Sequence, residues 1–192
     1  MTKPICLDRW AKVSRAGRGF AHAVSLETVI ELLREAVAEI TGADGVTVAR
    51  RDGDEVVMVG ADIVPPFVTG ARFAISRCIS GLAMLRREAI LVPEIRNDPR
   101  VPLNAYLATF VSTVAMFPVG HGAPVAAIGV YWKEPTPVSE ETLFLLDALT
   151  RSAGAMLEGL QLRADVEALR AGRRPAARIA GYAHAAMHAA LH

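Results

Sequence analysis

Apolar positions follow helical spacing in the first part of the chain. Between Ser25 and Gly42 they recur every three or four residues, at Val29, Leu32, Leu33, Ala36, Val37 and Ile40. Ser25 is a suitable N-cap, Glu27 places a negative charge in the first turn, and Gly42 is suited to ending a helix. The pattern predicts a helix with one apolar face.

Alternating and β-branched runs follow this helix and predict strands. Residues 45–50 and 55–60 flank Asp52-Gly53-Asp54, a tight-turn sequence, so we expect a hairpin. Short extended segments are expected at residues 72–75 and 90–92. Between them, the small and apolar residues of 79–88 predict a helix whose N-terminus lies near Ser76–Ser80.

The tract from Val101 to Trp132 contains no Asp, Glu, Lys or Arg, and about 20 apolar residues would suffice to span a bilayer. Two prolines and the sequence Gly120-His121-Gly122 interrupt this tract, and polar residues fill its first half. We therefore expect no membrane span. The tract instead predicts a short helix within residues 103–109 and two buried strands, 111–119 and 125–133.

A long helix is expected over residues 140–171, with Ser139 as its cap. Its apolar residues form a heptad-like series, which Arg163 interrupts and which then continues on a shifted face: Leu146, Leu149, Ala153, Met156 and Leu160, followed by Leu162, Val166 and Leu169. A single domain rarely needs so long a helix to cover its own sheet. The part that extends beyond the domain is therefore a candidate dimer element.

Three segments are expected along the chain. Residues 1–24 form a basic N-terminal helical extension, with a helix around Leu7–Arg15 that Gly17 and Gly19 end. Residues 25–162 form the globular domain, and residues 163–192 form a C-terminal helical extension. His184, His188 and His192 are four residues apart in that extension, a spacing that can bind a transition metal on a helix. No carboxylate or cysteine accompanies them, so no metal site is expected.

Composition narrows the classes of partner and compartment. The formal net charge of +1 gives no overall attraction to nucleic acid, so no nucleic-acid partner is expected. Cys6 and Cys78, the two cysteines, form neither a disulfide framework nor a zinc motif. The N-terminus lacks the apolar core of a signal peptide. These features together favour a reducing, cytoplasmic location.

The element order and three local motifs resemble those of the GAF domain family, over about residues 27–162. The order of helices and antiparallel strands indicates an α+β fold. The motifs are Ile79-Ser80-Gly81-Leu82-Ala83, Val92-Pro93-Glu94-Ile95 with Asn97-Asp98-Pro99-Arg100, and the paired strands Met116-Phe117-Pro118-Val119 and Ala127-Ile128-Gly129-Val130. The sequence most resembles GAF domains that are attached to bacterial sensor histidine kinases. That resemblance would place the chain in a two-component system.

This resemblance implies a central antiparallel sheet of about six strands, with helices packed on one face and a pocket on the other. GAF domains bind cyclic nucleotides, tetrapyrroles, haem, amino acids or other small molecules. The chain lacks the NKFDE-type motif of the cyclic-nucleotide class and the Asp-Ile-Pro signature of phytochromes, and Ile79 rather than a histidine follows Cys78. The free methionine-sulfoxide reductases of this fold use several cysteines, whereas this domain has only Cys78. The ligand or cofactor therefore stays unknown.

The candidate ligand-binding residues lie between residues 78 and 132. Cys78 is expected beside a helix N-terminus, where a thiolate is stabilised, although a buried cysteine more often serves as a small apolar residue. Aromatic surface and hydrogen-bonding groups complete the set: Asp98, Tyr106, Phe110, Ser112 and Trp132. Because side chains alternate along a strand, only one of Tyr131 and Trp132 can face a pocket. Turn formation explains Asp98 equally well.

Three functions stay open. The first is a non-catalytic small-molecule sensor, a homodimer through its terminal helices that passes its ligand state to a signalling partner. The second is an interaction or assembly protein with the same fold and a filled pocket. A pocket of several hundred Å3 would favour the sensor and a plugged one the assembly protein. The third is a redox or thiol sensor centred on Cys78, which requires alkylation of Cys78 to be faster than that of a model thiol.

Overall fold

The computed structural model describes residues 6–61, 68–102, 106, 109–120 and 122–173. Its helices are α1 (Leu7–His22), α2 (Leu26–Thr41), α3 (Ile79–Arg86) and α5 (Glu140–Arg170), with short 3-10 turns η1 (Ile75–Arg77) and η2 (Ile95–Asn97). Its strands are β1 (Gly45–Asp52), β2 (Glu55–Ala61), β3 (Arg72–Ala74), β4 (Ile90–Val92), β5 (Thr113–Val119) and β6 (Ala126–Trp132). The His184, His188 and His192 series and most of the helix expected within 103–109 lie outside the described residues.

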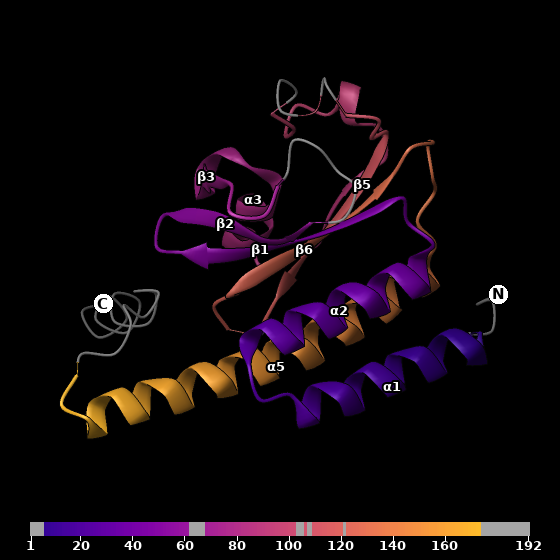
Figure 1. Ribbon diagram of the computed structural model, residues 1–192. Helices are drawn as coiled ribbons and strands as arrows, with labels where there is room; N and C mark the ends of the chain where they lie inside the picture. Colours follow the sequence, from indigo (N-terminus) through magenta and orange to yellow (C-terminus); the bar gives the residue numbers. More distant parts are fainter. Residues whose placement is uncertain (1–5, 62–67, 103–105, 107–108, 121, 174–192) are drawn as a thin grey trace, which may run out of the picture.

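The strands form one six-stranded sheet in the order β3-β2-β1-β6-β5-β4, and every neighbouring pair is antiparallel. Helices α1, α2 and α5 lie together beneath one face of this sheet, while α3 lies on the other side (Figure 1). The expected α+β fold with a six-stranded antiparallel sheet is therefore confirmed.

Strand alternation divides the interior into two cores, one on each face of the sheet. Residues at every second position of β1, β5 and β6 pack against the three long helices, including Val48, Phe117 and Ile128. The positions between them pack under α3 and the neighbouring loops, including Met116 and Tyr131. The helix-side core is the larger of the two.

The caps expected for α2 and α5 are present. The Ser25 hydroxyl accepts a hydrogen bond from the Thr28 N–H, and Gly42 ends α2 in the left-handed conformation. The Ser139 hydroxyl accepts from the Thr142 N–H at the start of α5, which has 31 residues. These local signals therefore predicted both helices correctly.

The expectation that glycines break the first helix is wrong, because α1 continues through Gly17 and Gly19 to His22. Val13, Ala16 and Phe20 of α1 are buried in the helix-side core. A Cβ on Gly19 would lie 3.2 Å from Leu32 Cδ1, so the glycine allows close packing on α2. Burial of the apolar face outweighs the low helix propensity of glycine, about 1 kcal/mol per residue.

Arg9 fixes the start of α1 to both neighbouring helices. Its guanidinium donates to the Ile40 carbonyl at the end of α2, to Glu141 Oε2 (3.1 Å) and to Thr142 Oγ1 (2.8 Å) at the start of α5. The Glu141 carboxylate also accepts from the Cys6 N–H. The N-terminal helix is thus an integral part of the helical layer.

The uncharged tract forms β5 and β6, two adjacent interior strands of the sheet, as its interrupted pattern predicts. Within the described part of the chain, no helix has both the length and the apolar character that crossing a membrane requires.

Candidate functional site

A small cavity lies on the face of the sheet that carries α3. Its volume is about 20 Å3, and its described lining residues are Thr47, Met58, Phe73, Cys78, Ile79, Ser80, Tyr106, Met116 and Tyr131. This volume suffices for about one water molecule. The site that the family resemblance assigns to a ligand is therefore filled by the protein's own side chains.

The ring of Tyr131 fills this space because Gly129 has no side chain. The two residues lie two apart on β6 and so share one face of the sheet. A Cβ on Gly129 would lie 2.6 Å from Tyr131 Oη, 2.8 Å from Met116 Cε and 2.9 Å from Thr47 Oγ1. The absent Cβ thus leaves room for three side chains that converge from three strands.

The polar groups of the cavity form a chain of hydroxyls. Tyr131 Oη lies 3.1 Å from Thr47 Oγ1, and the Tyr131 and Tyr106 side chains are hydrogen-bonded to each other. Burial raises the pKa of Tyr131 to about 12 and raises that of Tyr106 well above its ordinary value. Both phenols are therefore neutral near pH 7, and each offers one donor and one acceptor.

Cys78 lines the same cavity and caps α3, as expected from its position in the sequence. Its Sγ accepts from the Gly81 N–H (3.3 Å) and lies 3.4 Å from Ser80 Oγ, which donates to it. Gly81 is required here, because a Cβ would lie 1.8 Å from the Ile75 carbonyl oxygen. Cys78 is half-buried. Its role in ligand binding stays a prediction.

Asp98 lies in the turn that follows η2 and is paired with Arg100. The Arg100 guanidinium and its backbone N–H both donate to the Asp98 carboxylate, which lowers the pKa of Asp98. Arg100 also donates to the Leu91 carbonyl (2.7 Å) on the edge strand β4. The pair therefore shapes the turn and covers a strand edge.

Phe110 and Ser112 lie on the approach to β5, outside the described lining of the cavity. The Lys133 ammonium lies 4.9 Å from the centre of the Phe110 ring. This ring is half-buried and packs against the core on the α3 face of the sheet. The backbone of Ser112 donates to the Trp132 carbonyl and accepts from the Ile95 N–H. Of the predicted residues, only Cys78 and Tyr106 are brought together at the cavity.

The prediction that chose Trp132 for the pocket face is wrong. Trp132 packs in the helix-side core, whereas Tyr131 points into the cavity. The pairing register fixes this choice: Tyr131 lies opposite Val114 of β5, and Trp132 lies opposite Thr113. Thr47 and Met58 were missed as lining residues, and Tyr131 was considered only as the alternative to Trp132. The glycine two residues before Tyr131 and the single polar residue between Val46 and Val48 were the available signals.

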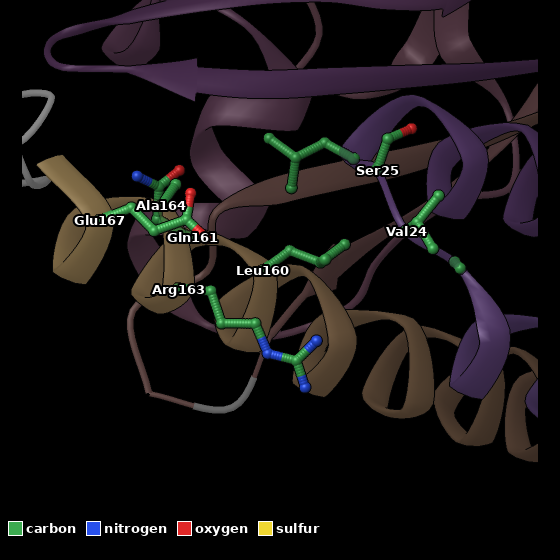
Figure 2. A pocket seen from close by; sticks show the side chains of 9 residues that line it. Val24, Ser25, Leu160, Gln161, Arg163, Ala164 and Glu167 are labelled. Atoms are coloured by element: carbon green, nitrogen blue, oxygen red, sulfur yellow. The ribbon is translucent and has the colours of Figure 1, made fainter.

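A second hollow lies on the helix side. This groove, about 340 Å3 in volume, runs between the α1–α2 connection and the later part of α5. Figure 2 shows Val24 and Ser25 on one side of it and Leu160, Gln161, Ala164 and Glu167 of α5 on the other, while Arg163 extends away from Gln161 and Glu167. The groove is not the pocket that the sequence predicted, because that pocket was expected on the opposite face of the sheet.

The described residues hold no group of three His, Cys, Asp or Glu side chains that could bind a metal ion.

Comparisons with known proteins agree on the fold. The GAF domain from an Acinetobacter phosphoenolpyruvate-protein phosphotransferase is 16% identical, with a TM-score of 0.67 over 90% of this chain and 99% of that one. The GAF domain of a Bacillus halodurans two-component sensor histidine kinase is 13% identical, with a TM-score of 0.64 over 73% and 99%. The free methionine-R-sulfoxide reductase of Neisseria meningitidis is 12% identical, with a TM-score of 0.67 over 85% and 96%.

No curated protein matches the sequence significantly. The sequence model of the GAF domain matches residues 23–158, which is most of the chain. The chain therefore belongs to the GAF domain family.

Proposed function

We propose that this chain is a non-catalytic regulatory GAF module that acts by binding another protein through its helical layer. In this proposal the cavity on the α3 face of the sheet is filled by the protein's own side chains and holds no ligand. GAF domains are typically small-molecule-sensing or regulatory domains. The cavity of about 20 Å3 is the observation that carries the proposal. Pockets for small ligands usually measure about 300–1,000 Å3, more than ten times this volume.

The helical layer supports the association. Large apolar side chains are exposed at both of its ends: Leu7, Trp10 and Phe144 at one, and Leu162, Val166 and Leu169 at the other. The Trp10 and Phe144 rings stack with their centres 5.9 Å apart. Exposed apolar groups gathered in patches favour a protein partner. We propose that the direct partner is a second copy of the chain, and that the resulting homodimer binds a signalling protein.

A small-molecule sensor is the second candidate, and the hydroxyl chain favours it. Thr47, Tyr131 and Tyr106 bring three hydroxyls to one point beside the Cys78 thiol, at the place where the family holds its ligands. A ligand would have to displace the Tyr131 ring, and α5 would transmit the resulting conformational change to the signalling partner. A two-component context and a cytoplasmic location belong to this proposal as well, and they rest on the family resemblance and on the two free cysteines.

Native mass spectrometry of the purified protein separates the two candidates. The filled-cavity module predicts a dimer whose mass is twice that of the chain, with no additional bound mass. A stoichiometric small molecule that is released on denaturation would overturn it in favour of the sensor. Visible absorbance of the same sample would identify that molecule as a haem or a tetrapyrrole.

A further inference from the structure

Helix α1 has one face that belongs to the core and one that does not. It packs against α2 and α5, and Figure 1 shows it at the outer edge of the helical layer, on the side away from the sheet. Val13, Ala16 and Phe20 form its inner face and are buried in the helix-side core. The opposite face of α1 is therefore directed away from the domain.

This outer face is apolar where α1 begins and basic further along. Leu7, Ala11, Arg15 and Arg18 follow one another at intervals of three or four residues, so they lie on the same side of the helix. All four are exposed, and the exposed fraction of Leu7 reaches 83%. The face thus combines a protruding apolar side chain with two guanidinium groups.

The charge of this face is not balanced within α1. Asp8 is the only acidic residue of the helix, and its carboxylate is paired with the Lys12 ammonium at 3.2 Å. Arg15 and Arg18 form no ion pair with any residue that the structure describes. Two positive charges are therefore left for an anionic partner.

Two aromatic rings enlarge the apolar part of the face. Trp10 of α1 and Phe144 of α5 stack with their ring centres 5.9 Å apart, and they are 39% and 53% exposed. Tryptophan is enriched at the headgroup level of membranes, because its ring is apolar and its N–H can stay in contact with water. Large apolar side chains beside arginines are typical of surfaces that lie on anionic bilayers.

The shape of the face favours a bilayer over a protein. The side chains that dominate protein interfaces usually fill well-packed pockets. Neither of the two hollows described above is lined by Leu7, Trp10 or Phe144. A bilayer needs no matching pocket, since protruding side chains enter the headgroup region and arginine side chains reach the charged headgroups from it.

We propose that the outer face of α1 docks on the surface of an anionic lipid bilayer. Leu7, Trp10 and Phe144 enter the headgroup region, while Arg15 and Arg18 contact the anionic headgroups. The inference goes beyond the proposed protein association. It assigns one apolar end of the helical layer to lipid and leaves the other end, on the late part of α5, to a protein partner.

Co-sedimentation of the full chain with lipid vesicles tests the charges. Vesicles of phosphatidylglycerol and phosphatidylcholine in equal parts should bind it at least about tenfold more tightly than phosphatidylcholine alone, because each basic residue near an anionic surface strengthens binding about fivefold. The double variant R15E/R18E should lose this preference. The control R77E/R96E changes the net charge equally, at exposed residues of η1 and η2 beside the core on the α3 face, and should keep it. Equal losses in both double variants would overturn the assigned face.

Fluorescence tests the apolar contact. Trp10 and Trp132 are the two tryptophans, and Trp132 is buried, so a change on adding the phosphatidylglycerol vesicles reports Trp10. Its emission should shift to shorter wavelength. Leu7→Ser should weaken vesicle binding at least about threefold, because the exposed side chain no longer contributes apolar area. Leu85→Ser on α3 should leave binding unchanged. Circular dichroism should show that all variants are folded.

The remaining outcomes separate this inference from the proposed association. Binding to neither kind of vesicle would overturn lipid docking. Capture of polyglutamate by the wild type but not by R15E/R18E would instead assign the face to an acidic protein. The dimer mass is measured without lipid, so a protein that dimerises but does not bind vesicles refutes only the lipid docking. A monomer that binds vesicles refutes only the association.

Discussion

The two faces of the sheet differ in what they leave open. On the α3 face, side chains from three strands and α3 close the interior to about 20 Å3. On the helix side, a groove of about 340 Å3 lies between the α1–α2 connection and α5, and the late part of α5 leaves apolar surface exposed at Leu162, Val166 and Leu169. The comparison indicates that this GAF domain offers an external surface where its relatives are expected to offer an internal pocket.

Tyr131→Ala should have the largest effect, because it removes a fully buried ring from the filled face. We expect a loss of about 3–5 kcal/mol in the free energy of unfolding, as for other large-to-small core changes. Urea denaturation followed by fluorescence would measure it. A loss below about 1 kcal/mol would show that the α3 face can rearrange easily, and would favour the sensor.

Tyr131→Phe is the matched control, since it keeps the ring and removes only the hydroxyl. It should destabilise the protein by about 1 kcal/mol, because Thr47 and Tyr106 each lose a partner.

A pair of glycines on α5 gives the next largest contrast. Gly154→Ala should destabilise the protein by about 1–3 kcal/mol, because its Cβ would lie 2.4 Å and 2.5 Å from the Gly120 N and Cα atoms, and backbone cannot shift easily. Gly159→Ala should instead stabilise it by about 0.5–1 kcal/mol, since its Cβ meets nothing and alanine favours the helix. Thermal unfolding of both variants measures this difference. Equal shifts in melting temperature would contradict the close contact between α5 and the hairpin of β5 and β6.

The smallest expected effect on stability comes from protonating Asp98, in the turn that it shares with Arg100, at acid pH. Hydrogen bonds from Arg100 lower the pKa of Asp98 in the folded state, so the pair stabilises the protein above the ordinary pKa of 3.8. That stability is lost as the pH falls through the lowered value. The acid limb of the stability curve, measured below about pH 4, should flatten in Asp98→Asn. An unchanged acid limb would show that the turn does not depend on the pair.

Local patterns predicted most of the elements. Ser25 and Ser139 marked two helix starts, Asp52-Gly53-Asp54 marked the hairpin, and Cys78 was placed at the start of α3. Each of these signals acts within a few residues, so neighbouring sequence is enough to read it. The first helix was misjudged because its glycines are tolerated only through contacts with α2 and α5.

The candidate site was predicted less well, because its residues come from distant segments. Cys78 and Tyr106 reach the cavity, whereas Asp98, Phe110 and Ser112 serve a turn, a cation contact and backbone pairing. Met58 carries no local sign of its role, and the sign of Thr47 is only that it is a polar residue between two valines.

The amino-acid sequence by itself determined the order of the helices and strands and the membership in the GAF family, since both are encoded in short motifs and periodicity. The tertiary structure alone decided that Tyr131 rather than Trp132 faces the cavity, because strand register depends on pairing with β1 and β5. It also decided that the cavity is filled and that the end of α5 is exposed. Both depend on how side chains from distant segments pack, which no single stretch of sequence contains.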